Sequence, residues 1–253
     1  MLFTRLVLIV VMQLVVMSSA NAKVPGDLLG LQKQCKSDTL DTAIKACSRI
    51  IERKGAALAT LFDAYSTRAF AYQGMGQFDN AVADFAKTIE FSKNAGKSGW
   101  ELAFFYFLRG NAYRGGGDLE KAITDHSESI RLAPGWDKSY SDRGAIYFQK
   151  GDFASALDDI SKVISFRPDS PRVAYAYAMR AMLQRRIGDP TKGLADANRS
   201  IELDGHSAMS LYIRAKIYEL LNRKDEAAAD LRAALVIDPN IGKEMEQMEQ
   251  IGR

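Results

Sequence analysis

Apolar and aromatic positions recur along this chain with the spacing of one helix face. An aromatic residue is followed four residues later by a small residue and seven residues later by a second aromatic residue. Residues at i, i+4 and i+7 lie on one side of an α-helix, and a small residue in the middle lets a second helix approach closely. The stripe occurs at Tyr65, Ala69, Tyr72; Tyr106, Gly110, Tyr113; Tyr140, Gly144, Tyr147; Tyr177, Ala181, Gln184; and Leu211, Ala215, Tyr218.

A second stripe follows each of these predicted helices after a short turn. The turns are Gly76-Gln77, Gly117-Asp118, Gly151-Asp152, Gly188-Asp189 and Asn222-Arg223. Gly and Asn tolerate the left-handed conformation that ends a helix, and Asp is suited to cap the next one. The second stripe begins at Ala81, Ala122, Ala156, Gly193 and Ala227, and Pro134, Pro168 and Pro239 follow it in three cases. Each segment therefore predicts a helix, a tight turn and a helix.

Arginine and aspartate are placed symmetrically about these turns. An arginine lies eight residues before each turn and an aspartate eight residues after it, so the two predicted helices bring them to the same height. We expect a salt bridge across each hairpin or between neighbouring hairpins, with the arginine stem under the aromatic stripe. A feature repeated in this way serves the stack rather than a ligand. The pairs are Arg68 and Asp84, Arg109 and Asp125, Arg143 and Asp159, Arg180 and Asp196, and Arg214 and Asp230.

Successive arginines are 41, 34, 37 and 34 residues apart, which indicates a basic period of 34. With its stripes and turns, the chain resembles the tetratricopeptide repeat family, in its bacterial exported form, over about residues 28–240. The segment Tyr106-Phe-Leu-Arg-Gly-Asn-Ala-Tyr113 followed by Gly117-Asp-Leu-Glu-Lys-Ala-Ile123-Thr-Asp125 is typical of that family. The resemblance implies an all-α fold, a right-handed superhelical solenoid of antiparallel helix hairpins. Gly193 and Gln184 depart from the usual alanine and tyrosine.

The pattern also predicts how the array is divided. We expect one solenoid over residues 23–253 with terminal caps, because an end unit otherwise exposes the face that a neighbour would cover. Leu40 to Ile51 has the second-helix pattern but no preceding arginine, which predicts a degenerate cap repeat over about residues 28–60. The repeats are expected at 62–98, 103–136, 137–170, 174–207 and 208–241, with a C-terminal capping helix at 242–253.

Residues 1–22 are expected to act as a signal peptide. Arg5 precedes the uncharged run Leu6 to Met17, and the segment ends Ala20-Asn21-Ala22, as secretory signals do before cleavage. The run is short for a membrane span, which needs about 20 residues. The expected location is the periplasm or the exterior. The alternative is an inner-membrane anchor formed by the uncleaved signal, which is also the only expected membrane contact.

The two cysteines of the chain both lie in the predicted cap. In an oxidising compartment, Cys35 and Cys47 are expected to form a disulfide. Two buried free thiols are the alternative. A redox-active pair is less favoured because the chain lacks Cys-x-x-Cys spacing.

The chain offers little for catalysis, and we expect no enzyme, cofactor or metal site. Its two histidines and two cysteines show no metal-ligand spacing. His126 takes a position that is apolar in most sister repeats, which predicts packing rather than base chemistry. Gly115 to Gly117 falls on a turn instead of a phosphate loop. The formal charge of +3 comes from interspersed residues of both signs, so no nucleic-acid partner is expected.

The irregular positions of the first helices are the candidates for function. In the family, first helices commonly line a concave groove that holds a protein or peptide partner. The predicted groove residues are Phe70, Gln73, Phe107, Asn111, Arg114, Phe148, Met182, Arg185, Tyr212 and Lys216. The expected function is an exported, non-catalytic scaffold that binds a protein or peptide within the cell envelope. The alternatives are an accessory protein with thiol or other enzymatic activity, and a structural protein that self-associates.

Overall fold

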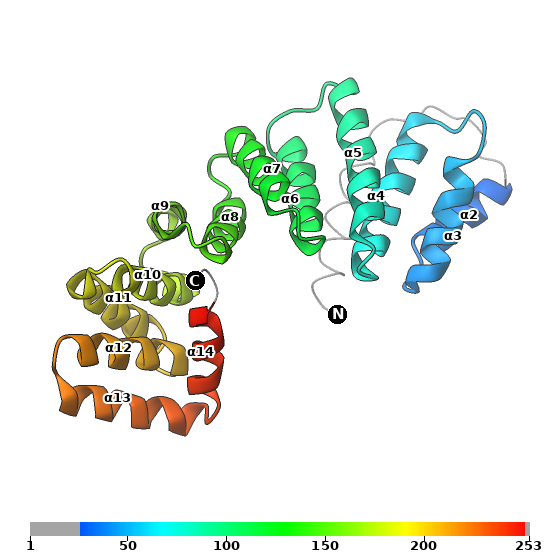
Figure 1. Cartoon of the computed structure of the whole chain (residues 1–253). Helices are drawn as coiled ribbons and strands as arrows, with labels where there is room; N and C mark the ends of the chain where they lie inside the picture. Colours follow the sequence, from blue (N-terminus) through cyan, green and yellow to red (C-terminus); the bar gives the residue numbers. More distant parts are fainter. Residues whose placement is uncertain (1–25, 251–253) are drawn as a thin grey trace. The chain divides into compact units, whose positions relative to one another are not determined.

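The computed structural model describes residues 26–250 and is all-α over them (Figure 1). The predicted signal peptide at residues 1–22 lies outside the described residues. No helix among residues 26–250 has the length and apolar character needed to cross a membrane. The helices are α2 (Gly26–Cys35), α3 (Leu40–Ile51), α4 (Leu58–Gly74), α5 (Phe78–Asn94), α6 (Trp100–Gly115), α7 (Leu119–Leu132), α8 (Asp137–Gln149), α9 (Phe153–Phe166), α10 (Ala174–Arg186), α11 (Pro190–Leu203), α12 (Ala208–Leu220), α13 (Lys224–Ile237) and α14 (Ile241–Gln250), with a 3-10 turn at Pro171–Val173.

The helices pair in chain order as antiparallel hairpins, and they fall into two compact units that part between Ser98 and Gly99. Unit 1 contains α2 to α5, and unit 2 contains α6 to α14. Within unit 2, each second helix also packs on the first helix of the next hairpin. Figure 1 shows this alternation from α6 to α13.

The predicted turns form as expected. Gly76, Gly117, Gly151, Gly188 and Asn222 all have φ between 59° and 88°, the left-handed region. The amide after each of them bonds back to a carbonyl near the end of the first helix, which satisfies a group that the helix leaves without an internal partner. The carboxylates of Asp118, Asp152 and Asp189 then accept hydrogen bonds from backbone N–H groups in the first turn of the second helix.

Small residues decide how closely the two helices of a hairpin approach. Ala81, Ala122 and Ala156 are completely buried. In the fifth hairpin even an alanine would be tight, because a Cβ added to Gly193 would lie 3.0 Å from the carbonyl oxygen of Ala181. Gly193 therefore fits this hairpin, in which α10 supplies Gln184 instead of the second tyrosine of the stripe.

All five arginine and aspartate pairs form, each as a two-point salt bridge across one hairpin. In the third pair, Nε and Nη2 of Arg143 donate to the two carboxylate oxygens of Asp159 at 2.9 and 2.7 Å. The Arg143 guanidinium also lies 5.9 and 5.8 Å from the ring centres of Tyr140 and Tyr147. The hydrogen bonds with Asp159 raise the pKa of Arg143. The other four pairs have the same geometry.

Four of these arginines also reach the second helix of the preceding hairpin. Nη1 of Arg143 donates to the hydroxyl of Ser127 at 2.8 Å, which ties α8 to α7. Each such arginine therefore connects three helices and holds neighbouring hairpins in register. The equivalent bonds run from Arg68 to Ser48, from Arg180 to Ser161 and from Arg214 to Asn198.

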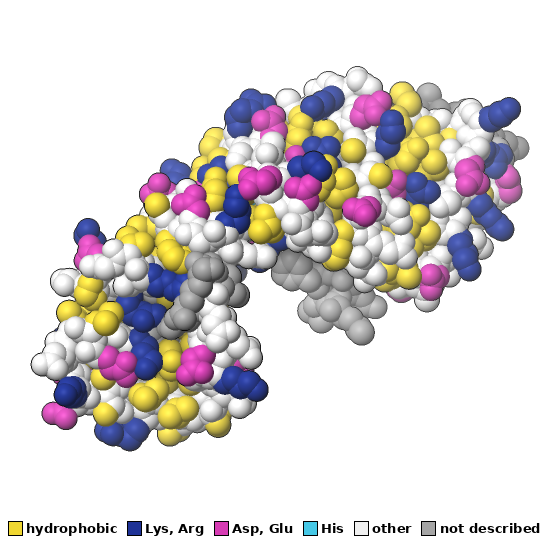
Figure 2. Space-filling view, viewed as in Figure 1, with side chains coloured by type: hydrophobic (Ala, Val, Ile, Leu, Met, Phe, Trp, Pro, Cys, Tyr) yellow, Lys and Arg dark blue, Asp and Glu magenta, His cyan; other side chains and the backbone are white. Residues whose placement is uncertain are grey.

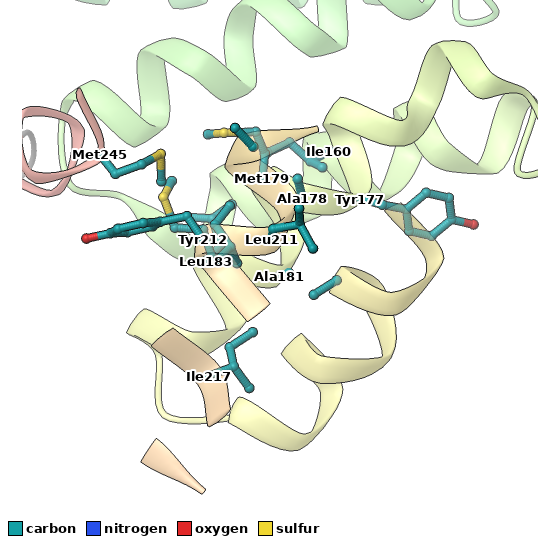
Figure 3. Close-up of a cluster of buried hydrophobic side chains, with 14 of the residues drawn as sticks. Ile160, Tyr177, Ala178, Met179, Ala181, Leu183, Leu211, Tyr212, Ile217 and Met245 are labelled. Atoms are coloured by element: carbon teal, nitrogen blue, oxygen red, sulfur yellow. The ribbon is translucent and has the colours of Figure 1, made fainter. Parts of the chain in front are cut away.

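The last helix, α14, contacts α12 and α13 and runs crosswise to both (Figure 1). Ile241 and Met245 are buried in the core cluster of unit 2, at 4% and 2% exposure. Figure 3 shows Met245 pointing from α14 toward Tyr212 and Leu183, on α12 and α10. The C-terminal helix therefore contributes side chains to the core of this unit.

Unit 1 begins with a cap in which Cys35, at the end of α2, is joined to Cys47 in α3 by a disulfide. The two Cα atoms are 4.8 Å apart, within the range that a disulfide spans. Both cysteines are buried, in a small cluster with Leu28, Ala46 and Ile50. The bond supplements a cap core that is otherwise made from a few apolar side chains.

Mass mapping without reductant is expected to recover a peptide crosslinked through Cys35 and Cys47. In the chain-entropy model, opening a loop of this size costs about 3 kcal/mol, so reduction should lower the stability of unit 1 by that order. A Cys35→Ala, Cys47→Ala double variant shows the stability of unit 1 without the disulfide and without added reductant. Alkylation of both thiols in the unreduced protein would contradict the disulfide.

Candidate protein-interaction face

An open cavity of about 470 Å³ lies in unit 2 between α8 and α10. Its walls come mainly from these two helices and from α9, with Arg114 of α6 and Met248 of α14 at its borders. Phe148 and Met179 supply apolar surface, and Ser141 supplies a hydroxyl group. A cavity with apolar walls and a few polar groups is the usual form of a binding pocket.

Two of the predicted groove residues, Arg114 and Phe148, line this cavity. Phe148 is only 6% exposed and belongs to the buried core of unit 2, so it forms the floor of the cavity. Sequence reasoning missed Tyr175, Met179 and Met248. Tyr175 is 60% exposed and stands five residues before Arg180, a position that our choice of groove positions left out. A tyrosine that lies outside the stripe of Tyr177, Ala181 and Gln184 was the signal that could have revealed it.

Met182 and Tyr212 do not lie on an open surface, contrary to the expectation for a groove. Their exposures are 0% and 5%, and they belong to the same buried cluster as Met245 of α14. Met245 of α14 points toward Tyr212 (Figure 3), so the C-terminal helix supplies apolar cover at one of the positions where a partner was expected. Lys216, on the same helix as Tyr212, forms a salt bridge with Glu219 at 3.0 Å and lies 5.5 Å from the Tyr212 ring centre. Arg185 is half-buried near the end of α10.

The predicted groove residues of α6 are held by neighbours in unit 2. Phe107 is half-buried, with its ring centre 4.8 Å from that of Trp136 and 5.6 Å from that of His126. Asn111 hydrogen-bonds Asp142 of α8. Burial raises the pKa of Asp142, an effect that Asn111 and Arg114 oppose. This part of the face is an aromatic and polar network rather than an empty groove.

In unit 1, the predicted residues Phe70 and Gln73 are half-buried on α4. The Phe70 ring meets Phe85 of α5 edge to face, with the centres 5.4 Å apart, so Phe70 contributes to its own hairpin. A second open cavity, of about 700 Å³, lies between α2 and α4 and is bordered by Asp63. Burial raises the pKa of Asp63.

His126 of α7 is completely buried. Neither ring nitrogen has a hydrogen-bond partner among the described residues. The ring packs beneath Gly110, where a Cβ would come within 3.1 Å of Nε2. Desolvation, with smaller contributions from Arg114 and Arg143, lowers the pKa of His126 to about 4. The histidine is therefore a packed, neutral side chain, as the sister positions Phe85, Ile160, Ala197 and Leu231 suggest.

The surface adds no concentrated charge and no metal-binding cluster. Within residues 26–250, no three His, Cys, Asp or Glu side chains are grouped so that they could hold a metal ion. On the face shown in Figure 2, basic and acidic side chains are interspersed.

Family models agree with the hairpin pattern. One tetratricopeptide repeat model matches residues 62–94, 105–135 and 137–170, and another matches residues 178–240. The chain belongs to the tetratricopeptide repeat family. Among curated proteins, it is 29% identical over 80 residues to the DnaJ homolog subfamily C member 7 homolog of Schizosaccharomyces pombe. That match covers 30% of this chain and 17% of the yeast protein.

Solved tetratricopeptide structures share the fold. A crystal structure of MamA has a TM-score of 0.61 at 18% identity, over 72% of this chain and 94% of MamA. MamA from Desulfovibrio magneticus RS-1 has a TM-score of 0.63 at 16% identity, over 73% and 98%. YrrB, described as a TPR protein with an unusual peptide-binding site, has a TM-score of 0.60 at 17% identity, over 81% and 99%. At these identities, the likeness establishes the fold.

Proposed function

We propose that this protein is an exported scaffold without catalytic activity that binds a protein or peptide partner at the cavity between α8 and α10. The observation that carries the proposal is the cavity itself, an apolar hollow on the first helices of a repeat fold with the exposed ring of Tyr175 at its border. An aromatic side chain beside an apolar hollow is a typical anchor at protein interfaces. The peptide-binding site of YrrB supports the same class of function.

Export to the periplasm or beyond is part of the proposal. It rests on the signal-like segment at residues 1–22 and on a cysteine pair that suits an oxidising compartment. Cys35 and Cys47 are 3% and 0% exposed, and a buried disulfide is poorly reached by an attacking thiolate. Their burial therefore favours a structural role over a redox role.

Affinity capture from the cell-envelope fraction tests this proposal. Tyr175→Ala should lower partner recovery, because it removes an exposed apolar contact at the cavity, and Phe107→Ala tests the neighbouring aromatic network. Phe148→Ala removes a core side chain that is 6% exposed, so its recovery is compared only after its unfolding midpoint is shown to equal that of the wild type. Leu220→Ala is the matched control for Tyr175→Ala, since Leu220 is also 60% exposed and does not line the cavity. Equal recovery by wild type and all variants would remove the assignment.

A further inference from the structure

The apolar stripe of α14 has the spacing of a bound helical ligand. Ile241 and Met245 are buried, and Met248, three residues further on, borders the open cavity. Side chains at i, i+4 and i+7 are the anchors by which an amphipathic helix binds a hydrophobic groove. The helix therefore covers one part of the predicted groove and ends beside the part that stays open.

Predicted groove residues lie in the same buried core as α14. Met182 of α10 and Tyr212 of α12 are buried in the cluster that includes Met245. Met248 then adjoins Phe148 and Tyr175 at the cavity. The cavity and the buried cluster share Phe148, Ile160 and Met179, so they are neighbouring parts of one apolar region of unit 2.

Charge on the two sides is complementary. Glu244 and Glu246 are exposed on α14, and its other described charged side chain is Lys243. The groove positions of unit 2 include Arg114, Arg185 and Lys216, although Asp142 and Glu219 lie among them. Lys216 is paired with Glu219, so Arg114 and Arg185 are the groups that favour a helix whose apolar stripe is flanked by carboxylates.

We infer that α14 is a resident ligand of this surface, and that the partner of the proposed function is an amphipathic helix of the same chemistry. Such a helix carries Met or aliphatic side chains at i, i+4 and i+7 with acidic residues beside them, and it binds by displacing α14. This inference rests on the proposed function and specifies both the partner class and its regulation. A tethered helix competes at a high effective concentration, so it lowers the apparent affinity for a free helix.

The test uses a fluorescent peptide with the sequence of residues 240–253 and the full chain in two forms. The Met245→Glu variant removes the buried anchor of α14 and should bind the peptide at least tenfold more tightly than the wild type does. A peptide that carries Met245→Glu and Met248→Glu should bind neither form. Equal affinity for wild type and variant, or no binding to a variant with unchanged helical circular dichroism, overturns the inference.

Hydrogen exchange on the wild-type chain covers the case in which Met245→Glu unfolds unit 2. Excess peptide should speed amide exchange in α14 and leave α11 unchanged. Unchanged exchange in α14 at saturating peptide overturns the inference.

The capture experiment with Tyr175→Ala is independent of this peptide. If capture depends on Tyr175 but the peptide does not bind, only the inference about α14 falls. If wild type and Tyr175→Ala recover the same amount of partner, the proposed function is contradicted as well.

Discussion

Replacing Arg143 with alanine is expected to lower the free energy of unfolding of unit 2 by about 3–5 kcal/mol, the usual cost of leaving a buried charge without its partner. Asp159 is 4% exposed, and its two carboxylate oxygens accept bonds from Arg143. The substitution also removes the bond to Ser127 that connects two hairpins. Urea unfolding followed by tryptophan fluorescence measures the loss, since both tryptophans, Trp100 and Trp136, lie in unit 2.

Arg131→Ala is the matched control. Arg131 makes the same two-point contact with Glu128, but its side chain is 66% exposed, and surface pairs contribute about 1 kcal/mol or less. An Arg143→Leu, Asp159→Leu double variant should be more stable than Arg143→Ala, because it leaves no buried charge without a partner. An Arg143→Ala protein that unfolds at the wild-type urea concentration would refute the role of these pairs.

Acidification is expected to destabilise unit 2 through His126. Its pKa is about 4 in the folded chain and about 6.5 when the chain is unfolded, so the unfolded state takes up the proton first as pH falls. The stability contributed by the neutral ring is complete above pH 6.5 and is lost as pH falls toward 4. At about 1.4 kcal/mol per pH unit, the loss approaches 3 kcal/mol.

His126→Leu isolates this effect, because the equivalent position of the last repeat is Leu231. The difference in unfolding free energy between wild type and variant should be constant above pH 7 and shift toward the variant by about 3 kcal/mol between pH 6.5 and 4. Parallel stability curves over that range would show that the histidine is not held neutral.

Most of the helical hairpin structure can be predicted from the sequence, because each structural position recurs in several repeats. The stripes, the left-handed turn residues and the arginine and aspartate pairs follow from helix periodicity and from symmetry about a turn. The contacts of Arg143 with Ser127 and of Arg68 with Ser48 could not be predicted in the same way. The number of residues between the arginine and its serine differs between these two contacts, because each contact joins neighbouring hairpins whose linkers vary in length.

The candidate site was only partly predictable, because it depends on elements outside the repeat. Met182 and Tyr212 occupy groove positions by periodicity, but their burial depends on how the helices of unit 2, α14 among them, pack together. The stripe of Ile241, Met245 and Met248 indicates an amphipathic helix without indicating which surface it covers. Tyr175 was missed because it lies five residues before Arg180, whereas the predicted groove positions lie two before, two after and five after each arginine.

The central claim is that the cavity between α8 and α10 binds the partner. Its most direct test is the affinity of a captured partner for purified wild type, Tyr175→Ala and Leu220→Ala. We expect the dissociation constant to rise at least tenfold, or about 1.4 kcal/mol, for Tyr175→Ala and to stay at the wild-type value for Leu220→Ala. Equal dissociation constants for all three proteins would contradict the claim.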